Sequence, residues 1–169
     1  MRFYRIKQFW WAISSYFKDI DNEYIDRYLD DHEKLLFDKL KIGDKHHCVR
    51  VSKDSLEIYD KLLAKVENID KYQLAKAALL HDIGKAERPL NFIEKSIVVI
   101  LHKITKGKIR RYENIKILDI YYNHPKKGVD MLWPYGYSEE FLQVIRLHHS
   151  KKVIDNPMLN IVIESDNKN

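Results

Sequence analysis

Apolar side chains recur along most of this chain at the spacing of α-helices. They return every three or four positions, and no stretch alternates between apolar and polar residues as a half-buried strand does. Only five glycines and four prolines interrupt the 169 residues. We therefore predict an all-α fold, with amphipathic helices in residues 1–42 that precede or pack on a helical domain in residues 43–169.

The first 20 residues contain the most aromatic of these apolar stripes. Its members are Ile6, Phe9, Trp10, Ile13, Phe17 and Ile20. A stripe this apolar has to be covered. We favour packing against the rest of the protein, and the alternative is a helix that lies on a membrane surface. A second helix is predicted over residues 24–40, and it ends before Gly43.

Capping signals predict where the next helices begin and end. A third helix is predicted over residues 45–66. A fourth begins at Asp70, because Asp70 and Gln73 have the spacing of a capping box. It runs into the sequence HDIG, where Gly84 is expected to end the helix.

The C-terminal half is expected to consist of further helices. Residues 90–122 are predicted to form two helices around the basic turn TKGKIRR. Pro125 is expected at the first position of another helix, where its missing N–H is tolerated. The stretch WPYGYS forms a turn before a helix capped by Ser138, and the last helix starts at Pro157.

The composition is that of one globular domain without a bilayer-spanning segment. Apolar residues make up 45% of the chain, but runs such as FWWAI and IVVIL are far shorter than the roughly 20 residues of a membrane helix. Polar residues also break up any signal-peptide core near the N-terminus. The single Cys48 cannot form an internal disulfide, so we expect a cytoplasmic protein. The net charge of +5 favours anionic partners without naming one.

Histidines and carboxylates fall in line with the apolar faces of five predicted helices. A single inward histidine is usually a core residue that hydrogen-bonds a carbonyl, so no position indicates a metal by itself. Several in one small domain need partners together, and a shared metal centre would satisfy them all. Imidazoles and carboxylates without thiolates suit Fe, Mn, Zn or Mg and argue against a structural zinc site. The residues in line are His47, His81, His124, His148, His149 and Asp166.

Five motifs in a fixed order extend this prediction. They are HHCVRV, AALLHDIGK, NHPKKGVDML, IRLHHS and LNIVIESD, and together they span roughly residues 44–166. In type and order they resemble the motifs of the HD-domain (HDIG-type) superfamily of metal-dependent phosphohydrolases. The resemblance implies an HD-domain helical bundle, with the helices of residues 1–42 as an N-terminal extension.

The resemblance also implies a set of metal ligands. One metal would be held by His47, His81, Asp82 and Asp166, and a second by His124, His148 and His149. Asp82 would bridge the two ions and act as the catalytic carboxylate that positions the nucleophile. We expect two divalent ions, iron or manganese in the first place, with Mg, Zn, Ni or Co as alternatives.

Two of these positions have a neighbouring competitor. His47 is preferred to His46 because the family places a valine four residues after the ligand, and here that residue is Val51. Asp166 is preferred to Asp155, which lacks an apolar stripe in front of it. The first choice follows the family pattern, and the second follows the apolar stripe and the position of Asp155 before the helix-starting Pro157.

The motifs also suggest how phosphate is bound. Lys85 matches a lysine that contacts substrate phosphate in HDIG members, and Arg88 is a second candidate. Asp44 is expected to cap a helix, and the alternative is an extra metal ligand or a partner of one. Two features depart from related patterns: SKKVIDNPM replaces the GYP signature of cyclic-di-GMP phosphodiesterases, and the long spacing before His124 predicts an inserted helix within residues 92–122.

The leading hypothesis is a phosphohydrolase that cleaves a phosphate ester of a nucleotide or another small molecule with a metal-activated water. The sequence is compatible with a phosphomonoesterase and with a phosphodiesterase, and it leaves the oligomeric state open. One alternative is a non-catalytic HD fold that binds metal as a sensor or scaffold. Another is a nucleic-acid-binding module, although acidic residues interrupt the basic cluster and favour a solvated face. The cluster consists of Lys103, Lys106, Lys108, Arg110, Arg111 and Lys116.

Overall fold

The computed structural model describes residues 19–62, 69–150 and 154–169, and helices are the only regular structure in these ranges. This confirms the all-α prediction. The aromatic helix predicted for the first 20 residues lies almost entirely outside the described residues. The boundary proposed between residues 42 and 43 stays a prediction. None of the described helices combines the length and the apolar content needed to span a bilayer.

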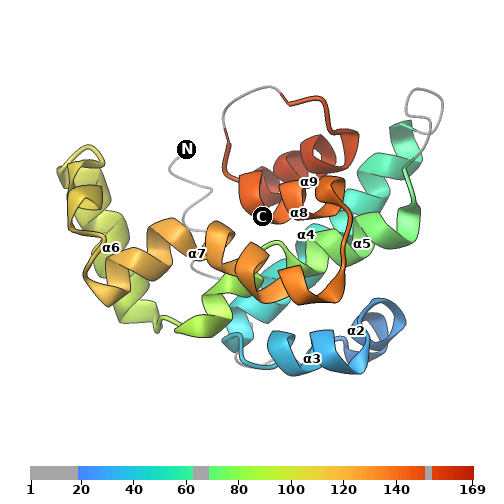
Figure 1. The fold of residues 1–169 in the computed structure, drawn as a ribbon, viewed down its shortest axis with the longest axis horizontal. Helices are drawn as coiled ribbons and strands as arrows, with labels where there is room; N and C mark the ends of the chain where they lie inside the picture. The colour runs from blue at the N-terminus through green and yellow to red at the C-terminus, as the bar shows by residue number, and fades with distance from the viewer. Residues whose placement is uncertain (1–18, 63–68, 151–153) are drawn as a thin grey trace.

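Figure 1 shows the helices in their order along the chain. The N-terminal half contains α2 (Asn22–Tyr28), α3 (Asp31–Phe37), α4 (Ile42–Leu62), α5 (Lys71–Leu80) and the 3₁₀ turn η1 (Ile83–Glu87). The C-terminal half contains α6 (Phe92–Ile104), the turn η2 (Lys108–Tyr112), α7 (Lys116–Leu132), the turn η3 (Trp133–Tyr135), α8 (Glu139–Leu147) and α9 (Pro157–Lys168).

Helix α4 is the central element of the bundle. It packs along α5 and α9, and α8 covers the bundle through contacts with α5, α7 and α9. The core between them is fully buried and includes Leu74, Leu79, Ile145 and Leu159. The short helices α2 and α3 pack on α5 and η1, below this core in Figure 1.

The prediction of one helix over residues 24–40 is wrong, because α2 and α3 are separate. Leu29 is extended, and Asp30 then starts α3. The Asp30 carboxylate accepts a hydrogen bond from the backbone N–H of Glu33 (2.9 Å), and the Glu33 carboxylate accepts one from the backbone N–H of Asp30 (2.7 Å). This capping box restarts the helix although the apolar period continues. Gly43, expected beyond a helix end, lies in the first turn of α4.

Two further predictions of helix ends are wrong. Pro125 does not begin a helix, because it lies inside α7. Gly84 does not terminate α5, which ends at Leu80, and Gly84 lies within η1. Among the described glycines only Gly107 and Gly136 have a positive φ. Both Pro125 and Gly84 have other roles, which the candidate metal centre explains.

The predicted starts of three helices are confirmed. The Asp70 carboxylate accepts a hydrogen bond from the backbone N–H of Gln73 at the start of α5. The Ser138 hydroxyl caps α8. Pro157 is the first residue of α9, directly after Asn156, whose side chain caps that helix. In each case a short polar side chain replaces a backbone partner that the first turn lacks.

Residues 92–115 form a projection that we call the α6 arm. It comprises α6, η2 and the turns that follow each of them. The prediction of two helices around the basic turn TKGKIRR corresponds to α6 and the start of α7, and the turn itself contains most of η2. Helix α6 packs mainly on α7 and η2. In Figure 1 the arm lies at the far left, away from α5, α8 and α9.

Candidate metal centre

The C-terminal ends of α5 and α8 meet residues of α4, α7 and α9 on one side of the bundle. His81 is the C-cap residue of α5, with Asp82 directly after it, and His148 is the C-cap residue of α8, with His149 after it. The remaining members are His47 in α4, His124 in α7 and Asp166 in α9. The seven ligands expected from the motifs therefore come from every helix around this point.

Two glycines allow η1 to cross α7 at close range. A Cβ atom on Gly84 would lie 1.9 Å from the backbone oxygen of His124 and 2.6 Å from the backbone nitrogen of Gly128. A Cβ atom on Gly128 would lie 2.8 Å from a methyl group of Ile145. Gly84 is therefore required by a close approach between backbones and not by a left-handed conformation. The crossing places Asp82, two residues before Gly84, against His124.

Backbone carbonyls fix the ring orientation of two histidines. His81 Nδ1 lies 2.7 Å from the carbonyl oxygen of Ala78, and His148 Nδ1 lies 2.8 Å from that of Ile145. A carbonyl only accepts hydrogen bonds, so Nδ1 carries the proton in both rings. In the neutral ring the other nitrogen, Nε2, is then a lone-pair acceptor. This is the arrangement of histidines that bind metal through Nε2.

Pro125 provides the same arrangement for His124. Proline has no N–H, so the carbonyl of Tyr121, four residues earlier, lacks its usual helical partner. His124 Nδ1 lies 3.1 Å from this carbonyl oxygen and 3.2 Å from that of Ile120. The proline inside α7 therefore leaves an acceptor for the ring and directs His124 Nε2 towards Asp82.

The two oxygens of Asp82 face different imidazoles. Oδ1 lies 3.2 Å from Nε2 of His124 and 3.6 Å from Nε2 of His148. Oδ2 lies 3.5 Å from Nε2 of His81 and 3.8 Å from Nε2 of His47. One carboxylate thus stands between two pairs of rings.

Asp166 completes the cluster from α9. Its Oδ1 lies 3.0 Å from Nε2 of His47, and its Oδ2 lies 3.7 Å from Nδ1 of His149. His149 Nε2 in turn lies 3.2 Å from His124 Nε2. The ligand atoms form two groups in which all atoms lie within 4.8 Å of one another: His47, His81 and Asp166, and Asp82, His124, His148 and His149.

The cluster has the hydrogen-bonding pattern of a cation site. His81 Nε2, His148 Nε2 and Asp82 Oδ1 are buried and have no hydrogen-bond partner within the described residues. Buried polar atoms are nearly always paired. Here the neighbouring atoms are acceptors that face acceptors, so a proton donor is missing and a cation satisfies them all. The residues therefore fit the imidazole and carboxylate coordination of divalent metals such as iron, manganese or zinc.

A family model agrees with this geometry. The model described as HD domain matches residues 45–167. The chain belongs to the HD-domain family. This confirms the resemblance to the superfamily of metal-dependent phosphohydrolases, and it agrees with a hydrolase-type, divalent-metal-dependent function. Comparison with curated proteins and with solved structures finds no match.

The shifted pKa values of the candidate ligands in this HD domain favour the protonation states that bind a cation. Burial lowers the pKa of His81 to about 4 and also lowers that of His124, so both rings are neutral at pH 7. Burial opposes the ionisation of Asp82, but the charge of Lys85 holds the pKa of its carboxyl well below the usual value. Burial likewise opposes the ionisation of Asp166, and its hydrogen bond with His47 lowers the pKa below the usual range.

The last turn of α9 is held against α4, and this fixes Asp166. Ser165 Oγ donates a hydrogen bond to the carbonyl of Val51 (3.2 Å). The side chain of Asn169 is buried and bonds both Asp54 (2.6 Å) and Arg50 (3.2 Å). These contacts order the end of the helix, where a last turn would otherwise fray. Asp155, the competitor of Asp166, is exposed before α9.

Of the two predicted phosphate-binding residues, Lys85 lies within η1 and Arg88 directly follows it, and each has an acidic partner. Lys85 Nζ donates to Asp82 Oδ2, and although burial opposes its charge, Asp82 raises the pKa of Lys85 above its ordinary value. Arg88 donates to Glu94 (2.7 Å), while its Nη1 is a buried donor without an acceptor among the described residues. Asp44, expected to cap a helix, is instead buried within the first turn of α4, where it accepts two hydrogen bonds from Lys95 (2.6 and 2.7 Å).

One neighbour of the site was not assigned to it from the sequence. Cys48 is fully buried next to His81 and Asp82, and its sulfur lies within 4.8 Å of their ligand atoms. Burial raises the pKa of its thiol well above the usual value, which keeps the sulfur protonated. Its position one residue after His47, on the inner side of α4, was the available signal. His102, which belongs to none of the five motifs, lies on α6 and contacts the hydroxyl of Tyr122 (2.8 Å).

Proposed function

We propose that this HD domain is a phosphohydrolase that cleaves a phosphate ester of a nucleotide or another small molecule at a binuclear metal centre. The observation that carries the proposal is the position of Asp82, whose two oxygens face separate groups of imidazoles and whose buried Oδ1 has no hydrogen-bond partner among the described residues. A carboxylate in this position is suited to bridge two cations.

The two groups of ligands would each hold one divalent ion. His47, His81, Asp82 and Asp166 would form the first site, and His124, His148 and His149 the second, with Asp82 shared. Such ions, when bound, supply positive charge to phosphoryl oxygens and acidify a water at neutral pH.

The protein's own residues would bind and orient the substrate. Lys85 remains protonated and can donate a charge-assisted hydrogen bond to a phosphate oxygen once a cation shares the charge of Asp82. Arg88 is a second donor through its unpaired Nη1. The side chain of His149 is 54% exposed while that of Asp82 is 1% exposed, so the substrate would approach from the side of His149.

Hydrolysis assays with reloaded protein test this proposal. Chelator-treated protein is supplied with manganese or ferrous iron and then given p-nitrophenyl phosphate, bis-p-nitrophenyl phosphate and a panel of nucleotides. We expect metal-dependent release of phosphate or of p-nitrophenol, and the panel distinguishes monoester from diester cleavage. His81→Ala and Asp82→Asn should abolish it, whereas His102→Ala, on α6 and outside the ligand cluster, should retain it. Lys85→Met should raise KM more than it lowers kcat.

Elemental analysis separates the catalytic proposal from the alternative of a metal-bound sensor or scaffold. Two equivalents of metal per chain together with turnover would support the enzyme. Two equivalents of metal without turnover on any ester would favour the sensor. Turnover that survives in both His81→Ala and Asp82→Asn would show that the chemistry occurs elsewhere.

A further inference from the structure

Helix α6 exposes an apolar stripe that no described residue covers. Ile93, Ile97, Ile100 and Ile104 are between 51% and 72% exposed. At about 100° per residue these four positions fall within a sector of about 60° on one side of the helix. Val98, on the other side, is buried. The helix thus packs through one face and presents an opposite face of isoleucines to solvent.

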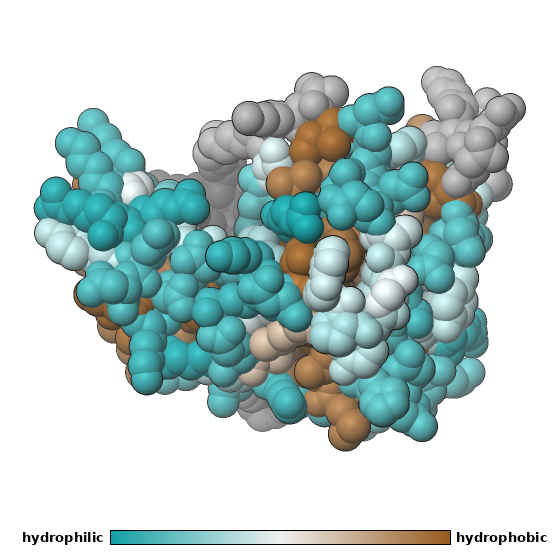
Figure 2. All heavy atoms as spheres, viewed as in Figure 1, coloured by the Kyte–Doolittle hydropathy of each residue, from teal (hydrophilic) through white to brown (hydrophobic). Residues whose placement is uncertain are grey.

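The exposed apolar residues are concentrated in the α6 arm. Eight of the twelve exposed large hydrophobic side chains among the described residues lie within residues 92–115. Single exposed apolar residues are normal, but a contiguous patch of this kind usually marks an interaction surface. Brown residues appear along the lower left edge of the molecule, where the arm lies, while teal residues cover the front of it (Figure 2).

The same segment carries most of the net charge of the chain. Residues 92–115 contain six lysines and arginines and two glutamates, so they hold four of the five net positive charges. Both glutamates have cationic partners, Glu94 with Arg88 (2.7 Å) and Glu113 with Arg110 (3.7 Å). The arm therefore combines an apolar stripe with an excess of cations.

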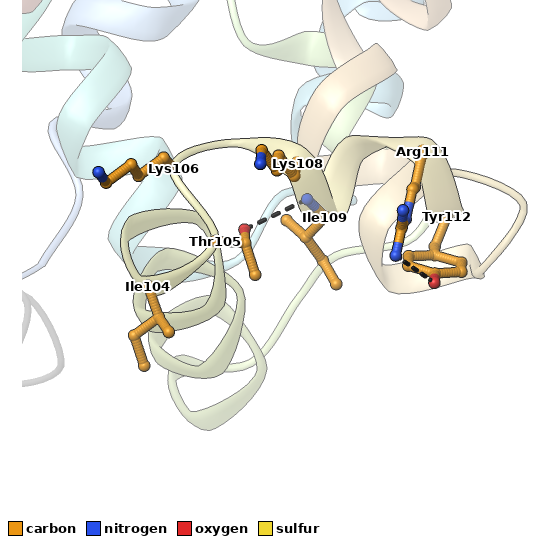
Figure 3. A pocket seen from close by; sticks show the side chains of 7 residues that line it. All are labelled: Ile104, Thr105, Lys106, Lys108, Ile109, Arg111 and Tyr112. Carbon is orange, nitrogen blue, oxygen red and sulfur yellow. Dashed lines mark hydrogen bonds between the residues drawn. The ribbon is translucent and has the colours of Figure 1, made fainter.

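A hollow of about 440 Å³ lies at the end of the stripe (Figure 3). Lys106, Lys108 and Arg111 line it together with Ile104 and Tyr112. None of its three cations forms an ion pair with a described residue. The hollow is thus a cationic recess that directly adjoins an exposed isoleucine.

We propose that the α6 arm docks on the surface of an anionic lipid bilayer. The isoleucines enter the boundary between headgroups and acyl chains, and the cations around the hollow contact lipid phosphates. An apolar face beside lysines and arginines is the pattern of helices that lie in a membrane interface, and cations near an anionic leaflet add to the binding. At about 1.5 Å per residue the 13 residues of α6 provide a contact about 20 Å long.

The chemistry of the stripe favours lipid over nucleic acid. A nucleic-acid surface needs cations and often aromatic rings for stacking, whereas the centre of this stripe is aliphatic.

The docking does not depend on the proposed hydrolase activity, because no expected metal ligand lies in the arm. Two ion pairs, Arg88 with Glu94 and Asp44 with Lys95, hold the base of α6 near η1 and α4.

Vesicle flotation with the full chain tests the docking. Vesicles of phosphatidylcholine alone are compared with vesicles that also contain phosphatidylserine. We expect binding to the anionic vesicles, weakened by salt, which screens surface charge. The double variant Ile97→Ser, Ile100→Ser should reduce binding by about tenfold or more, as each loses buried apolar area. Leu35→Ser, at a 65% exposed position on α3, should bind like the unchanged protein.

Replacing the three cations around the hollow by neutral residues should weaken vesicle binding to a comparable extent. The variant Lys106→Gln, Lys108→Gln, Arg111→Gln should lose about tenfold or more of the binding to anionic vesicles, because each cation near the surface contributes separately. Lys61→Gln, an exposed lysine at the end of α4, is the matched control and should change binding little.

A fluorescent label reports the depth of the stripe with a single substitution. Cys48 is the only cysteine of the chain and is fully buried, so an introduced cysteine is labelled selectively. An environment-sensitive dye on Ile100→Cys should shift to shorter wavelength with anionic vesicles, and the same dye on Leu35→Cys should not.

Three outcomes would overturn the docking. They are the absence of vesicle binding, binding that is equal in all arm variants and the controls, and an unshifted dye at position 100 on bound protein. Equal binding in all variants would indicate that another part of the chain, such as residues 1–18, makes the contact with the vesicles. Retention of an oligonucleotide that depends on the hollow, without vesicle binding, would assign the arm to nucleic acid.

Discussion

The substitution Gly84→Ala tests whether the crossing of η1 and α7 sets the geometry of the metal centre. The new methyl group would stand 1.9 Å from the backbone oxygen of His124, where ordinary contact begins at 3.4 Å. The shortfall is about 1.5 Å, and both sides are backbone, so no side chain can rotate away. The two segments have to separate, and the contact between Asp82 and His124 separates with them.

The expected magnitudes follow from this displacement. Overpacking a well-packed interior costs about 1–3 kcal/mol, and we expect the upper end because the obstacle is backbone. For a chain of this size about 3 kcal/mol lowers Tm by about 6–12 °C. A displacement of about 1 Å in a reacting site lowers turnover by about a hundredfold, and we expect the affinity for manganese to fall as well.

Gly136→Ala separates loss of stability from loss of the site. Gly136 has a φ of 72° and open space around its Cβ position, so alanine there costs about 1–2 kcal/mol through backbone strain alone. It should lower Tm but leave manganese affinity unchanged. Thermal melting and manganese titration of both variants measure the difference. If Gly84→Ala melted within 1 °C of the unchanged protein and bound manganese equally well, the reasoning about the crossing would be refuted.

Two further predictions concern stability. His81 has a folded pKa of about 4 against 6.5 in the unfolded chain, so the unfolded chain takes up its proton first as the pH falls. The metal-free protein should therefore lose about 3 kcal/mol of unfolding free energy through this residue between pH 6.5 and pH 4, which urea titrations would measure. Constant stability over that range would contradict a neutral buried ring. Lys76→Met removes the cation that pairs with the fully buried Glu33 (2.9 Å) and should lower the free energy of unfolding by about 3–5 kcal/mol at pH 7. The control Lys71→Met removes an exposed pair with Asp60 and should lower it by about 1 kcal/mol or less. Equal losses in the two variants would show that burial of the pair does not matter here.

Local signals in the sequence were sufficient for several helix starts and for the inward direction of the candidate site residues. Asp70, Ser138 and Pro157 mark helix starts because capping depends on a few neighbouring residues. His81 follows Leu74 and Ala78 on one helical face, so the apolar period alone directs its ring inwards. The order of the motifs then predicted which carboxylate joins the histidines, and Asp166 lies among them.

Other features depend on contacts between segments that are distant in sequence. Gly84 looked like a helix terminator, but its role depends on the backbone of α7, forty residues later in the chain. Pro125 looked like a helix start, but inside α7 it frees a carbonyl for the ring of His124. Asp44 pairs with Lys95 across two helices, which no local pattern could indicate.

The sequence by itself thus determined an all-α chain whose helices turn imidazoles and carboxylates towards a common interior. Only the tertiary structure decided which lone pairs face one another, that Asp82 stands between two groups of ligands, and that the isoleucines of α6 remain uncovered by the described residues. The physical reason is range: helix period and capping act over three or four residues, whereas ligand distances and exposed faces depend on how whole helices pack.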